Sequence, residues 1–186
     1  MNISISINGV LRNLLSRIKY VYEKYTSKEI GEITDLDLSK FLDFNSEEEL
    51  LEFIYVECPM EIFGHGGDNN KNIFNIFNRY YQENKLLNNI RLVSDEIEKA
   101  RPATMFFLAK NGVVSDELRF YNINQIKGLW EDTDLFITSD PEILKNKPNR
   151  GKTIKIETEY NKDIDSDYVI NSFDEVFELE YDEERN

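Results

Sequence analysis

The sequence of 186 residues is short of cysteine, histidine, alanine and basic side chains, and these shortages exclude several classes of protein. The single cysteine, Cys58, rules out a disulfide framework, a redox pair or a cysteine cluster for a metal. The 22 Lys and Arg residues against 36 Asp and Glu give a formal net charge of -14. Because nucleic acid and anionic lipid attract clustered cations, we expect neither nucleic acid nor membrane among the partners.

Long hydrophobic runs are also missing. No apolar run approaches the ~18–20 residues that span a bilayer, and the first residues lack the basic and apolar regions of a cleavable signal peptide. The hydrophobic fraction of 40%, with 12% aromatic residues, is nevertheless too high for a disordered acidic chain. Richness in Asn, Ile and Lys suggests an AT-rich genome. These features predict a soluble globular protein of a virion or a host cytoplasm.

Alternating strand and helix patterns predict an α/β fold. Short β-branched and apolar runs that end in turn residues predict strands over 3–7, 90–94, 118–121, 134–139, 153–157 and 168–170. Apolar residues at helical spacing predict helices over 10–25, 95–110 and 123–130, and Ser172 begins a last helical turn. Pro102 should kink or split the second helix, and Gly112 should end it. Strands separated by helices favour a parallel, Rossmann-like sheet with its ligand site where the strands end.

Residues 26–88 interrupt this alternation and predict a small helical insertion. Ser46 and Glu49 have the spacing of a capping box, which begins a helix, and a further helix is expected from Asn72 to Glu83. We therefore assign residues 1–25 and 89–186 to an α/β core, and residues 26–88 to an inserted helical cap. The glycine-rich stretch around His65 is interpreted as a hinge between the two.

The order of these segments resembles the haloacid dehalogenase (HAD) superfamily, and within it the deoxyribonucleotidase-like branch often found in phage genomes. The resemblance covers nearly the whole chain and runs through SISINGVL, an inserted helical segment, IRLVSDE, LRFYN and DLFITSDPEIL. It implies a three-layer Rossmann-like HAD core with a small helical cap. Phosphatases of this superfamily use two aspartates as nucleophile and acid/base, a Ser or Thr and a Lys to hold the phosphoryl group, and carboxylates to hold Mg²⁺.

The first of these motifs, Asp-x-Asp-Gly, is changed at both acidic positions. Ser6 stands where the resemblance places the nucleophile, and Asn8 stands where it places the acid/base. An amide such as that of Asn8 cannot shuttle a proton. Ser6 lacks an activating histidine nearby, because the single histidine falls in the insertion.

The later motifs are partly retained. Ser94 matches the second motif, and Lys127 is a candidate for the third. Thr138 and Ser139 occupy the positions where the fourth motif has its Mg²⁺-binding carboxylates, and Asp140 follows one position late. A single carboxylate rarely holds Mg²⁺ without a substrate phosphate to share it.

These changes predict a catalytically degenerate HAD-like protein, a pseudoenzyme that serves as a structural or interaction module in a phage virion or its assembly. We expect no catalytic residue, no cofactor and no metal. The expected partners are other proteins, including virion components and further copies of this chain. The acidic tail, residues 174–184, would favour a basic partner if it docks.

Two alternatives stay open. The chain could be an active Mg²⁺-dependent 5′-nucleotidase or phosphatase with a rearranged site, in which Ser94, Lys127 and Asp140 act and His65 is recruited from the cap. It could also be a ligand-binding relic that holds a nucleotide at the strand ends without cleaving it. The first alternative requires turnover that depends on Ser94 and Asp140, and the second requires stabilisation by nucleotides.

Overall fold

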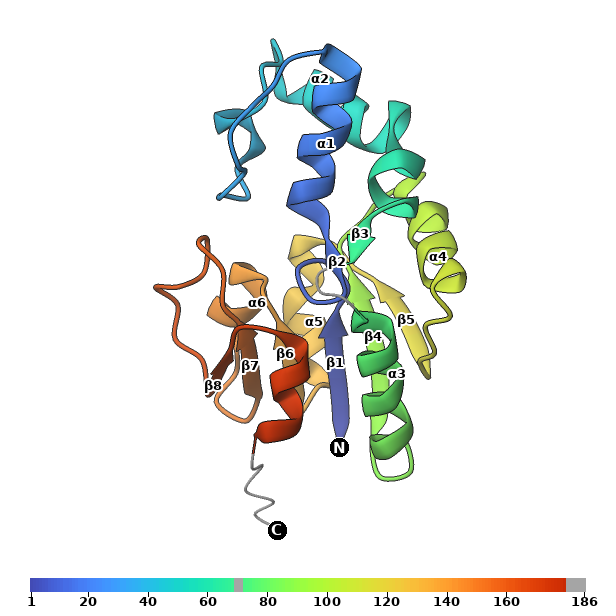
Figure 1. The fold of residues 1–186 in the computed structure, drawn as a ribbon. Helices are drawn as coiled ribbons and strands as arrows, with labels where there is room; N and C mark the ends of the chain where they lie inside the picture. Colours follow the sequence, from blue (N-terminus) through green and yellow to red (C-terminus); the bar gives the residue numbers. More distant parts are fainter. Residues whose placement is uncertain (69–71, 180–186) are drawn as a thin grey trace.

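The computed structural model describes residues 1–68 and 72–179, which form an α/β fold around a six-stranded parallel sheet (Figure 1). Its strands are β1 (Asn2–Ser6), β4 (Asn89–Ser94), β5 (Glu117–Phe120), β6 (Leu135–Thr138), β7 (Lys152–Ile156) and β8 (Tyr168–Ile170). They lie in the order β5-β4-β1-β6-β7-β8, and each neighbouring pair is parallel. The predicted Rossmann-like fold and each predicted strand are therefore confirmed.

The helical elements differ in length and type. The α-helices are α1 (Leu14–Thr26), α2 (Glu47–Glu52), α3 (Ile73–Asn84), α4 (Ala100–Lys110), α5 (Ile126–Glu131) and α6 (Pro141–Lys145). Shorter 3-10 segments are η1 (Leu38–Lys40), η4 (Ile123–Gln125) and η5 (Phe173–Glu178), and π-helical segments are η2 (Phe53–Glu57) and η3 (Met60–Gly64). Among the described residues, no helix is both long and apolar enough to cross a bilayer.

Helices cover both faces of the sheet, which gives three layers. On one face, α3, α4 and η5 pack against the strands in a single apolar cluster. On the other face, α5 and α6 bury Trp130 and Ile143 against Val93 and Phe136. The ring centroids of Trp130 and Phe136 lie 5.2 Å apart, so the tryptophan packs its helix onto the sheet. Because both faces are covered, the strands are apolar along most of their length.

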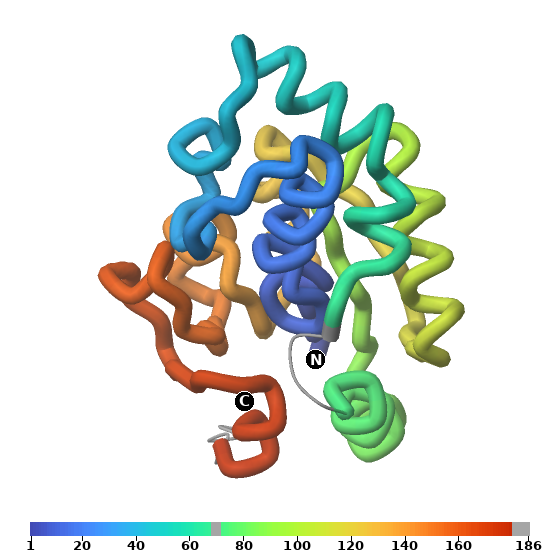
Figure 2. Tube along the Cα trace, turned by 45° about the horizontal axis from the view of Figure 1, so that its top comes forward, coloured from blue at the N-terminus to red at the C-terminus, as the bar shows by residue number. Residues whose placement is uncertain are grey.

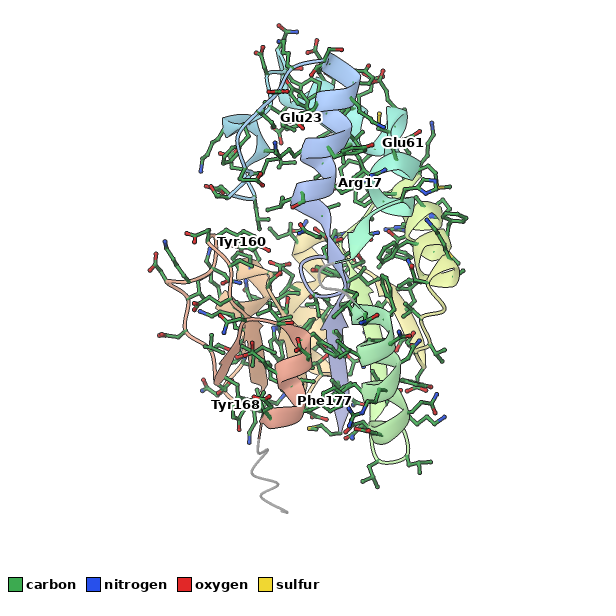
Figure 3. All side chains as sticks on the ribbon, in the orientation of Figure 1. Arg17, Glu23, Glu61, Tyr160, Tyr168 and Phe177 are labelled. Carbon is green, nitrogen blue, oxygen red and sulfur yellow. The ribbon has the colours of Figure 1, made fainter. Side chains whose placement is uncertain are left out.

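A separate helical layer lies beyond the C-terminal ends of the strands, with α1 at its centre (Figures 1 and 2). Its apolar cluster combines α1 with α2, η2 and η3, and it includes Cys58, which is buried as a small apolar residue. Arg17 on α1 donates a hydrogen bond from Nε to the carbonyl of Glu61 on η3 at 2.7 Å, and Figure 3 labels both residues. α1 packs in this layer and α3 packs on the sheet, while the boundaries 26–88 of the insertion stay a prediction.

Two strands of two residues each connect the helical layer to the sheet. β2 (Arg12–Asn13) pairs antiparallel with β3 (Gly67–Asp68). The helix predicted from Val10 therefore begins only at Leu14, where Asn13 caps it by accepting a hydrogen bond from a backbone N–H. The chain enters and leaves the helical layer side by side, next to the end of β1.

Local sequence signals succeeded where a cap or a stop residue was explicit. Ser46 caps α2 by accepting a hydrogen bond from the N–H of Glu49, and Gly112, with a φ of +62°, follows the end of α4. The predicted kink at Pro102 was wrong. α4 begins at Ala100, so Pro102 lies in the first turn, where a missing N–H costs no helical hydrogen bond.

Candidate functional site

A cavity of about 660 Å³ lies at the C-terminal ends of the central strands, where residues of the helical layer face the sheet. Its lining comes from the ends of β1, β4, β6 and β7 and from α1 and the segment around Ile33. Tyr160, labelled in Figure 3, lies on the loop after β7 and is part of this lining. In open α/β sheets such a crevice forms where the strand order reverses, and here β1 separates β4 from β6.

The fold brings most of the motif residues together in this cavity. Those that line it are Ser6, Asn8, Ser94, Ser139 and Asp140. Thr138 is fully buried and contacts Ser6 from the neighbouring strand. Lys127 is exposed on α5 and is not part of the lining. His65 is exposed too, with its ring 5.6 Å from that of Phe106, and it also lies outside the lining.

Ser6 has a neutral hydrogen-bond partner. Its hydroxyl and that of Thr138 lie 2.7 Å apart, and both side chains are buried. Thr138 Oγ1 also accepts a hydrogen bond from the N–H of Asp140 at 2.9 Å. A serine becomes a nucleophile when an adjacent base takes its proton, and a threonine hydroxyl is not such a base. The arrangement therefore holds the strand ends of β1 and β6 together.

Asn8 has all of its hydrogen-bonding capacity occupied. Its Oδ1 accepts from Nε of Arg12 at 3.0 Å and from Nη2 of the same residue at 2.6 Å. Its Nδ2 donates to Asp95 at 2.9 Å and to Glu96 at 3.0 Å. An amide side chain has two donor hydrogens and one acceptor oxygen with two lone pairs, so this set is complete. Asn8 links a cation to two carboxylates and has no remaining site for proton transfer.

Arg12 and Glu96 form a buried ion pair behind the cavity, with side chains 0% and 1% exposed. Arg12 also donates to the carbonyl of Phe63 at 2.8 Å and to the hydroxyl of Thr104 at 2.9 Å. Its guanidinium lies 5.2 Å and 5.1 Å from the ring centroids of Phe63 and Phe107. Burial lowers the pKa of Arg12 and raises the pKa of Glu96, and the attraction between the two groups opposes both shifts.

Asp140 is held by two donors. Its Oδ1 accepts from the N–H of Glu142 at 2.8 Å, which caps α6, and its Oδ2 accepts from the hydroxyl of Tyr121 at 3.0 Å. Burial raises the pKa of Asp140, and the charge of Asp95 raises it further. The two hydrogen bonds partly oppose this shift, because they stabilise the carboxylate. The net result is that the pKa of Asp140 lies above its ordinary value in the folded chain.

Two buried hydroxyl groups of the lining lack a completed hydrogen bond. Ser94 is 2% exposed, and its Oγ has no partner of acceptable geometry. The hydroxyl lies close enough to Glu96 to lower the pKa of that carboxyl, although Glu96 Oε2 also completes no hydrogen bond. Thr158 Oγ1 is the second such hydroxyl, although it lies near enough to Tyr160 to lower the pKa of that phenol. Buried polar atoms of this kind are ordinarily satisfied by water or by a ligand.

Among the residues that the structure describes, the charged side chains of the cavity lining are all acidic, and they are Asp95, Asp140, Glu142, Glu157 and Glu159. Each of the three glutamates lies within ion-pair distance of a lysine, in the pairs Lys145–Glu142, Lys155–Glu157 and Lys162–Glu159, at 2.9, 3.5 and 3.0 Å. Within residues 1–68 and 72–179, Asp95 and Asp140 form no ion pair. These two aspartates are therefore the acidic groups of the described lining that no lysine pairs with.

The side chains at the strand ends do not fit Mg²⁺, the ion that the resemblance implies. In the described part of the chain, no three His, Cys, Asp or Glu side chains converge as a metal site. Both oxygens of Asp140 already accept hydrogen bonds, and so does one oxygen of Asp95. Mg²⁺ demands near-octahedral oxygen ligands and is reluctant to lose its water. We therefore derive no chemistry from a metal at this position.

Sequence reasoning missed the ion pair and the phenol at this site. Arg12 was expected on the first helix and Glu96 on the second, and neither position carries a motif. The pair forms because β2 turns Arg12 back toward the end of β4, which is a long-range event. Tyr121 was expected as the last strand residue, and its place next to Asp140 follows from the sheet order.

The fold and the cavity define a Rossmann-like α/β protein with an acidic cavity at its strand ends. No protein-family model matches the chain, and no curated protein matches it.

Proposed function

We propose that this protein is a catalytically degenerate HAD-like protein that serves as a structural or interaction module. The observation that carries the proposal is the cavity at the strand ends, where the lining from residues 1–68 and 72–179 contains carboxylates and no basic side chain. A phosphate ester would be repelled there, because its charge needs cationic or N–H partners. The positions that correspond to the nucleophile and the acid/base, Ser6 and Asn8, are neutral and hydrogen-bonded to other side chains.

The partners proposed for such a module are other proteins, with a phage virion or its assembly as the setting. The setting rests on the resemblance and on the amino-acid composition. The net charge of -14 favours a partner of opposite charge, since complementary potentials speed association and exclude wrong partners. Leu86 and Leu87, in the turn between α3 and β4, are 87% and 81% exposed, which adds adjacent apolar side chains available for contact.

Phosphate release from deoxynucleoside monophosphates in the presence of Mg²⁺ tests the proposal. We expect the purified protein to release no more phosphate than a blank. Ser94→Ala and Asp140→Asn serve as matched variants, because the active alternative requires both side chains. Mg²⁺-dependent release that falls in both variants would overturn the proposal and support a 5′-nucleotidase or phosphatase. Release that is equal in all three proteins would identify a contaminating activity.

Thermal unfolding with the same nucleotides tests the ligand-binding relic. A ligand that binds only the folded state raises its stability by about 2.7 kcal/mol at a hundredfold excess over its dissociation constant. We expect the melting temperature to stay unchanged at millimolar nucleotide. A rise that grows with nucleotide concentration, without phosphate release, would support a nucleotide-binding protein in place of a protein-interaction module.

A further inference from the structure

We propose that the cavity binds the ammonium group of a lysine side chain, presented by a partner protein, between Asp95 and Asp140. The inference rests on the proposed function, because it states the chemistry of the partner that the interaction module takes. It depends on charge, hydrogen-bonding capacity and shape at the ends of β4 and β6.

The two aspartates face a common space from opposite sides of β1. Asp95 directly follows β4, Asp140 follows β6 by two positions, and both line the same cavity. No lysine or arginine of the described residues joins them in the lining. Arg12, whose charge interacts with Asp95, is already paired with Glu96 and is fully buried. Two carboxylates that repel each other favour a cation between them.

Ser94 supplies a further acceptor at the same place. It precedes Asp95 in the chain, lines the cavity and is 2% exposed, and its Oγ completes no hydrogen bond. An ammonium group has three N–H donors and no acceptor. Two carboxylates and one hydroxyl oxygen match that set in number. A bound ammonium could donate to a lone pair of this hydroxyl while the hydroxyl stays near Glu96.

The donor pattern favours lysine over arginine. A guanidinium binds a carboxylate best in a bidentate pair, which needs both oxygens of one group. Asp140 uses its two oxygens for the N–H of Glu142 and the hydroxyl of Tyr121, and Asp95 uses Oδ1 for Asn8. The remaining lone pairs of the two carboxylates can each accept a single hydrogen bond. An ammonium group, which is compact and has three rotatable N–H donors, can supply such single bonds.

Apolar side chains line the rest of the cavity and suit the stem of a lysine. They include Val10, Leu14, Leu15, Ile123 and Ile126. Lysine buries its four-carbon stem against such surface while its charged end reaches polar groups. A volume of about 660 Å³ exceeds what one side chain fills, so residues adjacent to the lysine in a protein segment also find room.

Isothermal titration calorimetry with a short peptide tests the inference on the full-length protein. The probe is an eight-residue peptide with three lysines, and its controls are the same peptide with N-ε-acetylated lysines and with glutamates in their place. We expect binding of the lysine peptide alone, because acetylation removes the charge and keeps the stem. Spermidine, a free alkyl amine, separates the two sources of ammonium and should bind at least about tenfold more weakly, since it lacks the flanking peptide contacts.

Three charge-neutralising variants locate the binding site. Asp95→Asn keeps an oxygen acceptor for Asn8. Asp140→Asn keeps one acceptor oxygen, which can serve the cap of α6, and loses the acceptor for Tyr121, so circular dichroism checks that both variants are folded. We expect each of these two variants to weaken lysine-peptide binding about tenfold, because each removes one of the two negative charges that face the ammonium group. Glu48→Gln removes the same charge from an exposed position on α2 and should change affinity by less than about twofold.

The outcomes separate this inference from the proposed function. Equal binding of the acetylated peptide, or equal weakening by Glu48→Gln and Asp95→Asn, overturns the inference by showing that the cavity is not the ammonium site. Spermidine binding that matches or exceeds peptide binding overturns the assignment to a partner protein. Failure of the lysine peptide to bind, with no phosphate release, overturns the inference alone and leaves the module intact. Mg²⁺-dependent turnover overturns both.

Discussion

Gly9 and Ser139 approach so closely that a β-carbon on Gly9 would lie 1.8 Å from the Oγ of Ser139. Gly9 also has a φ of +76°, in the left-handed region that side chains disfavour. Two independent features therefore require glycine directly after the end of β1. The contact also fixes the distance between the strand ends that carry Asn8 and Asp140.

Replacing Gly9 with alanine is expected to destabilise the fold by about 2–4 kcal/mol, because the new methyl group both strains the backbone and displaces Ser139. Urea unfolding followed by circular dichroism measures the change. Two further glycines separate the causes. Gly112 has a φ of +62°, and a β-carbon added there would have no atom within 4 Å, so Gly112→Ala should destabilise the protein by about 1 kcal/mol. Gly31 has neither a positive φ nor a close neighbour, so Gly31→Ala should change the stability little. Equal losses at Gly9 and Gly112 would show that Ser139 yields freely.

Replacing Arg12 with methionine is expected to destabilise the protein by about 3–5 kcal/mol, because Glu96 is left buried without its cation. The double variant Arg12→Met/Glu96→Leu should lose much less than the sum of the single losses, since it removes both charges together. Chemical denaturation of all three variants gives the coupling. Lys28→Met breaks an exposed pair with Asp43 and should have no measurable effect. Additive losses in the double variant would contradict a tightly coupled pair.

Neutralising Asp140 should change how stability depends on pH. Burial raises the pKa of Asp140 in the folded chain above its ordinary value of 3.8, so the folded chain keeps a proton that the unfolded chain has released. The stability contributed by this group is present at low pH and falls as pH rises through the folded pKa. Asp140→Asn cannot titrate, so its stability relative to the wild type should rise over that interval and then level off. Urea unfolding from about pH 4 to pH 7 measures the difference.

The pH-dependent unfolding of Asp140→Asn needs a control variant that loses the same charge elsewhere. Glu48→Gln removes one negative charge from an exposed helical position and corrects for the effect of net charge alone. If the stability difference between Asp140→Asn and the wild type were constant across the range, the raised pKa of Asp140 would be contradicted.

The sheet was predictable because each strand is a short local pattern with an explicit ending. Buried on both faces, the segments around Ile5, Leu92 and Ile137 are apolar enough to stand out from the acidic background. The beginnings of α1 and α4 were predicted four and five residues too early. In α1 the cause is β2, because the pairing of Asn13 with Gly67 is invisible to any local pattern.

The sequence predicts which strand-end residues meet at the site, but it does not predict how the charged side chains are placed there. Strand-end residues such as Ser6, Ser94 and Asp140 meet in the cavity because parallel strands end on one edge. From the sequence alone, Asp140 is expected to be the single carboxylate at the strand ends. The structure places Asp95 near enough to act on it, and this follows from the position of β4 beside β1. Lys127 was proposed from its place in the chain, and the orientation of α5 leaves it exposed.

The antiparallel pairing of β2 with β3 makes the helical layer a separable piece of chain. Asn13 and Gly67, the residues on either side of residues 14–66, are cross-strand partners, so a two-residue hairpin turn could join them directly. All six strands of the parallel sheet lie outside the excised stretch. The cost falls on α4, where Ala100 and Ala103 now pack against that layer and would need polar replacements. A miniature protein that keeps the sheet and loses the helical layer can therefore be designed from this chain by one deletion, a two-residue turn and polar replacements on α4.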